Sequence, residues 1–238
     1  MKLFREKNIQ QLIEGLEYDE YDDVLQDSLV NVDEMPESGH NFLNLYLTAA
    51  LEKFPNGNVL EIGCGGGSLF NKYPITHAIE PATGRFKVAV AEGKKHGVTV
   101  TQEVAECVGF DDNFFCAVIM INGFFQVRSD HEALIEINRI MVRGGVCVLS
   151  LLTNDEIDIV QGRVLGVNNY IRMLGQFGFS CIGKIACNAG PRFTPPKQVN
   201  TFIAIQKDRD FDYRWLAQPQ VNPEHIINYL EERDWRLK

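Results

Sequence analysis

Three glycines that follow a predicted strand are the residues best placed to hold a ligand. Residues 58–67 read NVLEIGCGGG, so an apolar strand runs directly into a turn with glycine at positions 63, 65 and 67. The β-branched and leucine residues of this stretch suit a strand that is buried on both faces. Because glycine accepts positive φ and has no Cβ, Gly63, Gly65 and Gly67 would let a cofactor lie against the main chain.

Two acids lie close to this turn in the predicted sheet. Glu61 precedes the first glycine, and Glu80 follows the next apolar segment, 75–79. A carboxylate can accept hydrogen bonds from both hydroxyls of a ribose and repels a phosphate. The acids therefore favour a positively charged nucleoside without phosphate. An NAD-dependent oxidoreductase is the rival interpretation, and Ser68 disfavours it because the dinucleotide motif has its third glycine there.

The glycine turn and the two acids together resemble the class I S-adenosylmethionine-dependent methyltransferases. In that family the turn lies against the methionyl and ribose parts of the cofactor, and the acid after the second strand holds the ribose hydroxyls. The resemblance implies that S-adenosylmethionine is the cofactor. It also implies that the contacts in this half of the site come from Glu61, Gly63, Cys64, Gly65, Gly67, Glu80 and Pro81.

Two later segments are similar to the type 11 methyltransferases within that class. Residues 105–115, AECVGFDDNFF, resemble the pattern AE-x-L-P-F-x-D-x-x-F-D, and residues 134–146 resemble L-x-E-x-x-R-V-L-x-P-G-G. The first pattern implies that the Ala105 main chain meets the adenine. The preceding position, often an acid in the family, is Val104 here, so a carboxylate contact would come from Glu103 or Glu106.

The end of the fourth predicted strand completes the expected cofactor site. Asn122 and Gly123 directly follow the apolar run 117–121. Their amide and glycine character would allow close approach to the methyl group of the cofactor. The segment before the glycine motif, 1–54, is expected to be mostly helical. The resemblance implies that it covers the cofactor and helps to form the acceptor pocket. His40 and Tyr18 are the residues there that we expect to assist catalysis.

The alternation of predicted strands and helices indicates an α/β fold with a parallel sheet. Helices are expected over 68–73, 85–96, 130–141 and 164–177, and glycines 144 and 145 are expected to reverse the chain before a strand at 146–152. The resemblance implies a Rossmann-like three-layer sandwich with seven mostly parallel strands in the order 3-2-1-4-5-7-6. We expect a lid segment at 1–54, a methyltransferase core at 55–207 and an accessory tail at 208–238.

The charge, cysteine content and apolar runs of the sequence limit which substrates, metals and membranes the protein is expected to bind. The net charge is −9, from 23 basic and 32 acidic residues, and basic residues do not cluster beyond Lys94 and Lys95. Binding a phosphate backbone depends on basic residues, so a nucleic-acid substrate is disfavoured. The six cysteines form no C-x-x-C pair, so no metal site is expected. No apolar run has membrane-spanning length, and a cytoplasmic monomer or homodimer is expected.

The sequence therefore predicts transfer of a methyl group to a small molecule at oxygen, nitrogen or carbon. No His or acid lies in a recognisable general-base motif, so alignment of the acceptor with the methyl group would be the main source of catalysis. A non-catalytic subunit that binds S-adenosylmethionine is the alternative, because position 104 departs from the family pattern, as does Cys116, where an acid is usual.

Overall fold

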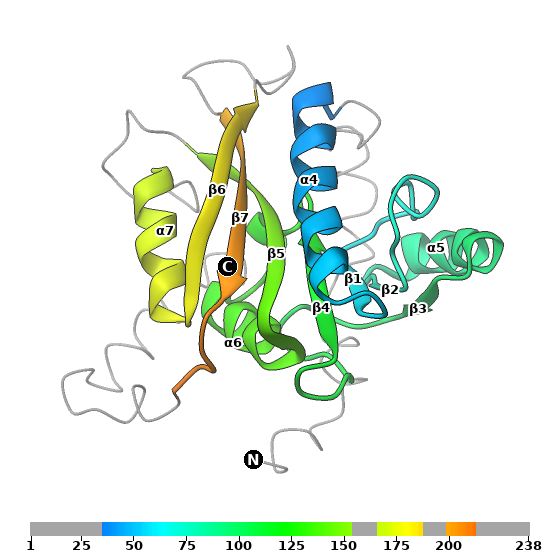
Figure 1. Cartoon of the computed structure of the whole chain (residues 1–238). Coiled ribbons are helices and arrows are strands. Elements are labelled where there is room, and N and C mark those ends of the chain that lie inside the picture. Colours follow the sequence, from blue (N-terminus) through cyan, green and yellow to red (C-terminus); the bar gives the residue numbers. More distant parts are fainter. Residues whose placement is uncertain (1–34, 154–165, 188–198, 213–238) are drawn as a thin grey trace, which may run out of the picture.

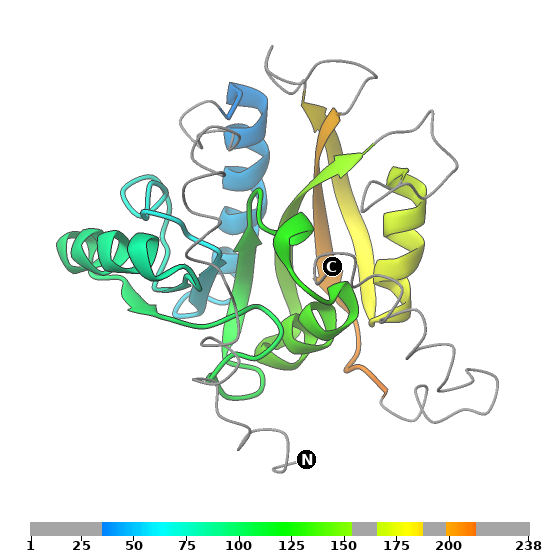
Figure 2. The same cartoon turned by 180° about the vertical axis from the view of Figure 1, so that it is seen from behind.

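A computed structural model describes residues 35–153, 166–187 and 199–212 of the chain. Figure 1 shows a central sheet with helices on both of its faces, and Figure 2 shows the opposite side. Tyr18 and most of the predicted lid and tail lie outside the described residues. In the described part, no helix combines the length and apolar character that crossing a membrane requires.

Seven strands form the sheet in the order β3-β2-β1-β4-β5-β7-β6, which confirms the predicted order. Strands β1 to β5 pair in parallel, and β7 pairs antiparallel with both β5 and β6. Because β1 to β5 are parallel, their carboxyl ends lie at one edge of the sheet, where α/β proteins bind ligands. The strand bounds are Asn58–Ile62 for β1, His77–Ile79 for β2, Thr99–Thr101 for β3, Phe115–Met120 for β4, Met141–Thr153 for β5, Phe179–Cys187 for β6 and Val199–Lys207 for β7.

Helices bury the two faces of the sheet in separate hydrophobic cores. Helices α4 (Glu37–Lys53) and α5 (Thr83–His96) cover one face, and α6 (Asp130–Ile140) and α7 (Val167–Gln176) cover the other. The central strand β4 is buried along its whole length, as expected for a strand between two helical layers. Local signals fix the helix ends: the Ser129 hydroxyl caps α6, and Gly97 ends α5 in the left-handed conformation.

Two local predictions were wrong. Residues 68–73 form turns instead of a helix, because only a few residues separate Gly67, whose φ is +82°, from Pro74. Glycines 144 and 145 do not reverse the chain; β5 runs through them. Met141 pairs with Phe115 and Val146 pairs with Ala117, so β5 carries the extra residues as an irregularity in its pairing with β4.

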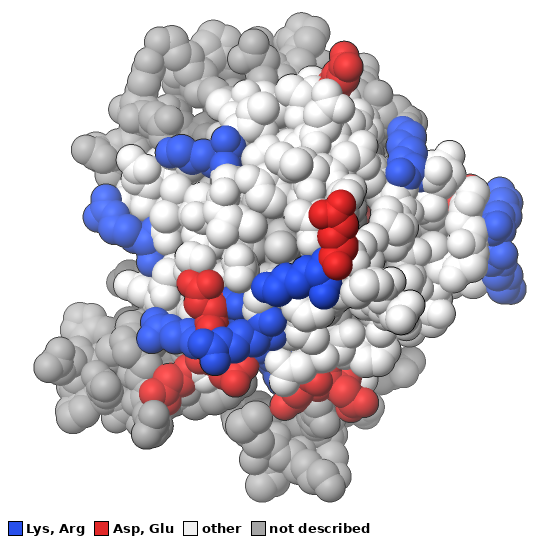
Figure 3. Space-filling model, viewed as in Figure 1, with Lys and Arg blue, Asp and Glu red and all other residues white. Residues whose placement is uncertain are grey.

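Strand β6 lies at one edge of the sheet and is protected by its own irregular pairing. Its register with β7 shifts between Cys181 and Gly183, and the Tyr46 hydroxyl of α4 donates to the Ile182 carbonyl at 3.1 Å. A bulge with an engaged carbonyl makes an edge a poor template for another strand. On the face shown in Figure 3, the described basic side chains are scattered and several lie beside acidic ones.

Candidate functional site

The turn after β1 is joined directly to the end of β2. Ile62 pairs with Ile79, and the Gly63 and Cys64 main-chain N–H groups both donate to the Ile79 carbonyl, at 2.9 and 3.1 Å. This pairing brings the glycine turn beside Glu80, the residue that follows Ile79. The two stretches that the sequence singled out therefore form one continuous surface at the carboxyl edge of the sheet.

All three glycines of the motif adopt positive φ, with values of +70° at Gly63, +55° at Gly65 and +82° at Gly67. A Cβ placed on Gly63 or Gly65 would have no atom of the described part of the chain within 4 Å. At Gly67, in contrast, a Cβ would collide with the Phe70 ring, so this glycine is needed for packing within the turn. The space above Gly63 and Gly65 is thus open main-chain surface of the kind that a cofactor can lie against.

Glu80 points toward the glycine turn. Its Oε2 accepts a hydrogen bond from the Gly65 N–H at 2.7 Å, and its Oε1 accepts from the Ala82 N–H at 3.0 Å. The side chain is only 5% exposed. Glu80 therefore orients the glycine turn, and its contact with the ribose hydroxyls stays a prediction.

Glu61 is a buried acid beside this surface. It is 3% exposed, and its Oε2 has no hydrogen-bond partner among the residues that the structure describes. Burial and, secondarily, the nearby Glu80 charge raise the pKa of Glu61 to about 8. Burial and the two acids also raise the pKa of the Cys64 thiol, so this thiol stays protonated and unreactive. Glu61 is therefore mostly protonated at pH 7 in the folded protein, and a cation bound beside it would favour its ionised form.

The end of β4 reaches the same place from the other side of β1. A Cβ on Gly123 would lie 3.6 Å from the Ile62 carbonyl, so Gly123 lies against the start of the glycine turn. Asn122 has a φ of +55°, and its N–H donates to the Ser150 hydroxyl at 2.7 Å. The structure thus brings Asn122 and Gly123 to the predicted site. Ser150 was missed by the sequence analysis, because a serine within an apolar strand gives no signal by itself.

The segment predicted to meet adenine is held by its own acids. Glu103 accepts from the Gly109 N–H at 2.7 Å, and Glu106 accepts from the Arg128 and Ser129 N–H groups at 2.5 and 3.2 Å. Ala105 between them is buried. Both carboxylates therefore shape the main chain of this segment, and an adenine contact from either remains a prediction.

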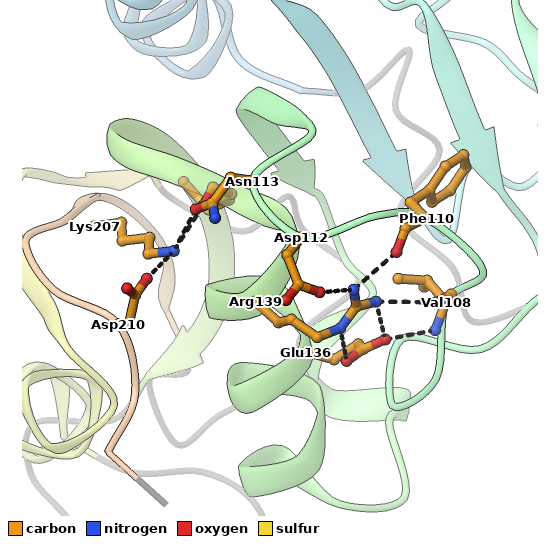
Figure 4. Close-up of polar contacts among 9 residues, drawn as sticks. Val108, Phe110, Asp112, Asn113, Glu136, Arg139, Lys207 and Asp210 are labelled. Atoms are coloured by element: carbon orange, nitrogen blue, oxygen red, sulfur yellow. Dashed lines mark hydrogen bonds and ion pairs between the residues drawn. The ribbon is translucent and has the colours of Figure 1, made fainter. Parts of the chain in front are cut away.

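Arg139 fastens the neighbouring loop to helix α6. Its guanidinium forms a bidentate pair with Glu136 and also donates to Asp112 and to the carbonyls of Val108 and Phe110 (Figure 4). Glu136 in turn accepts from the Val108 N–H at 3.0 Å. These are the acid and arginine of the pattern in residues 134–146, and their contacts position the loop between β3 and β4.

The two predicted catalytic residues have different outcomes. His40 lies on α4 with its Nδ1 2.6 Å from the Tyr73 hydroxyl, and the two rings are stacked with centroids 6.1 Å apart. Burial raises the pKa of Tyr73 to about 12, so its hydroxyl is neutral near pH 7. Tyr18 lies outside the described residues. Pro81, the last predicted cofactor residue, follows Glu80, and its carbonyl accepts from Gln102 at 3.0 Å.

Comparison with known proteins supports this arrangement. The family model described as a methyltransferase domain matches residues 60–149, which include the glycine turn, both acids and the end of β4. A comparison with curated protein sequences found no match.

Solved structures of similar fold include a SAM-dependent methyltransferase from Thermotoga maritima described as a possible histamine N-methyltransferase. It is 19% identical with a TM-score of 0.51 and covers 71% of this chain and 91% of its own. A SAM-dependent methyltransferase from Methanosarcina mazei is 16% identical with a TM-score of 0.51, covering 63% and 92%. The cyclase SpnF is 14% identical with a TM-score of 0.57, covering 69% and 81%. At these identities the likeness shows the fold alone.

S-adenosylmethionine fits the residues that form this site. Gly63 and Gly65 leave open main chain, the unpartnered Glu61 Oε2 lies nearby, and Glu80 turns its carboxylate to the same surface. Residues 60–149 match the family model of a methyltransferase domain, and the chain carries the fold of the class I S-adenosylmethionine-dependent methyltransferases, which indicates S-adenosylmethionine as the cofactor.

Proposed function

We propose that this protein transfers a methyl group from S-adenosylmethionine to a small-molecule acceptor at oxygen, nitrogen or carbon. The observation that supports this proposal most directly is the hydrogen bond from the Gly65 N–H to Glu80. It joins the turn after β1 to the end of β2, beside the open space at Gly63 and Gly65. A cationic cofactor also fits Glu61, because a nearby positive charge would favour ionisation of this buried acid, whereas a phosphate would oppose it.

Each part of the site has a distinct role in this proposal. Glu80 accepts from the ribose hydroxyls, and Gly63 and Gly65 let the methionyl portion lie against the main chain. The segment around Ala105 lies against the adenine. Asn122 and Gly123 form the wall nearest the reacting methyl group. The sulfonium supplies an activated methyl group with a neutral leaving group, so the residues of the chain chiefly align the acceptor and exclude water.

The acceptor is proposed to be a small molecule because basic residues do not cluster in the sequence. His40 and Tyr73 form a hydrogen-bonded pair on the α4 side of the sheet. A histidine in such a pair can accept a proton from an acceptor that must lose one during transfer. We propose His40 for this role, while the role of Tyr18, a cytoplasmic location and the monomeric or dimeric state stay predictions.

Titration calorimetry with S-adenosylmethionine, S-adenosylhomocysteine and NAD tests the cofactor part of this proposal. We expect both sulfur compounds to bind and NAD not to bind. Glu80→Ala should weaken binding by about 1.5–3 kcal/mol, or roughly 10- to 150-fold, because charge-assisted hydrogen bonds to the ribose are lost. Glu92→Ala is the matched control, since it removes the same charge from the outer part of α5 and should leave the affinity unchanged.

The methyl-transfer part needs a second measurement. Formation of S-adenosylhomocysteine should be followed with pooled phenols, amines, carboxylic acids and activated carbon acids as acceptors. Turnover with one pool identifies the acceptor class. Binding of S-adenosylmethionine without turnover in any pool would favour the non-catalytic alternative, and binding of NAD alone would contradict the proposal as a whole.

A further inference from the structure

Asn122 has an uncommon backbone conformation that the structure holds in place. Among the described residues, only Asn122 and Asn113 have positive φ without being glycine, and both have a φ of +55°. This conformation is disfavoured for most residues with a Cβ, and although Asn adopts it more readily than the others, contacts with neighbouring groups still help to hold it. Uncommon backbone conformations of this kind cluster at ligand sites.

The Ser150 side chain makes two hydrogen bonds with Asn122. Its hydroxyl accepts from the Asn122 N–H at 2.7 Å and donates to Asn122 Oδ1 at 3.1 Å. Ser150 lies on β5 and is only 1% exposed, so water does not compete for its hydroxyl. The Gln126 side chain also donates to the Asn122 carbonyl at 3.0 Å. One buried hydroxyl therefore holds both the main chain and the side chain of Asn122.

The fixed residue lies where the cofactor site needs a defined wall. Asn122 comes directly after the end of β4, and Gly123 lies against the Ile62 carbonyl at the start of the glycine turn. A Cβ on Gly123 would also be within 3.2 Å of the Met120 side chain, so this residue has little freedom to move. The direction of the main chain at Asn122 thus decides how residues 122 and 123 face the turn.

We propose that Ser150 is a positioning residue, whose hydroxyl holds Asn122 in the left-handed conformation and thereby fixes the main chain of residues 122 and 123 as a wall of the cofactor site. This inference rests on the proposed function and adds to it a residue that touches neither cofactor nor acceptor. Asn113 offers an internal comparison. Its side chain is held by Lys207, as Figure 4 shows, but it lies at the start of β4 and thus at the opposite edge of the sheet.

A double-mutant cycle tests the inference through the affinity for S-adenosylhomocysteine, measured by titration calorimetry. Ser150→Ala should weaken binding about 5- to 10-fold, as expected for the loss of one or two hydrogen bonds that hold the wall. Asn122→Gly supplies the second background of the cycle, because glycine adopts this φ without help from Ser150. In the Asn122→Gly background, Ser150→Ala should then change the affinity by less than twofold. Asn113→Gly is the control and should leave the affinity unchanged.

Hydrogen exchange gives a readout that does not need a ligand. The amide of Asn122 should exchange faster in Ser150→Ala than in the wild type, while amides in the middle of β4 keep their protection. The inference is overturned if Ser150→Ala binds as the wild type does, or if it loses the same affinity in both backgrounds. If the wild type itself binds no S-adenosylhomocysteine, the proposed function fails, and the inference that rests on it fails too.

Discussion

At the scale of single residues, main-chain geometry distinguishes the site more than side-chain chemistry does. Gly63 and Gly65 leave open space at positive φ, and Glu80 uses both carboxylate oxygens to hold main-chain N–H groups. The open glycines follow from the residue type, so the sequence could predict them, whereas the two main-chain contacts of Glu80 became visible only in the structure. The bonds between Ser150 and Asn122 could not be predicted, because they depend on the register between β4 and β5.

Replacing Gly65 by valine should abolish cofactor binding and leave the fold intact. The new side chain would occupy the open space above the turn, and the positive φ would cost about 1–2 kcal/mol of stability. Gly97→Val is the matched control, because Gly97 also has positive φ and no described atom within 4 Å of its Cβ position, but it lies at the end of α5. Calorimetry and urea unfolding should show equal destabilisation in both variants and loss of binding only at position 65.

Glu61 should make the stability of the protein depend on pH. Its pKa is raised from 4.5 to about 8 by burial and by Glu80, so the folded protein keeps a proton that the unfolded chain has lost. The free energy of unfolding should therefore fall as the pH rises from about 4.5 to 8. Relative to Glu61→Gln, which stays neutral, the wild type should lose at most about 4 kcal/mol between pH 5 and pH 8.

Urea unfolding of both proteins at pH 5, 6.5 and 8 would measure this difference. Other titrating groups are the same in the two proteins and largely cancel in the comparison. Parallel stability curves for the wild type and Glu61→Gln would contradict the raised pKa. Because a cationic cofactor favours the ionised acid, saturating S-adenosylmethionine should reduce the pH dependence of the wild type.

At the scale of elements, the loop between β3 and β4 depends on helix α6. Arg139 is only 10% exposed in its side chain and binds two acids and two loop carbonyls. The pattern in residues 134–146 pointed to this arginine, but its partners across the loop became visible only in the structure. At residues 68–73 the sequence predicted a helix, and the structure has turns. Gly67 and Pro74 leave too few residues between them for a helix.

Arg139→Ala should destabilise the protein by about 3 kcal/mol, because it leaves the partly buried Glu136 without its cation. Binding of S-adenosylmethionine should also weaken, since residues 105 and 106 belong to the same loop. Lys95→Ala is the control: its pair with Glu92 is exposed and contributes little. Urea unfolding and calorimetry would measure both effects. An unchanged affinity with lowered stability would separate the loop from the cofactor site.

At the scale of the whole molecule, the strand order places the predicted site residues at one edge of the sheet. The order could be predicted because the motifs identify the fold, and its parallel part brings together the carboxyl ends of β1, β2 and β4. The opposite edge is built differently, with His77 in ring contact with Phe110, Phe114 and Phe115 near the start of β2. Burial lowers the pKa of His77 there.

The difference between the two edges of the sheet predicts which main-chain amides a bound cofactor protects from hydrogen exchange. S-adenosylmethionine at 100 times its dissociation constant should stabilise the protein by about 2.7 kcal/mol, because it binds only the folded state. Hydrogen exchange should slow at residues 63–67, 80–82 and 122–123, and much less at residues 113–115 at the opposite edge. NAD at the same concentration should produce neither effect. Protection concentrated at residues 113–115 would contradict the site, since the carboxyl edge alone carries the open glycine turn and the acid that faces it.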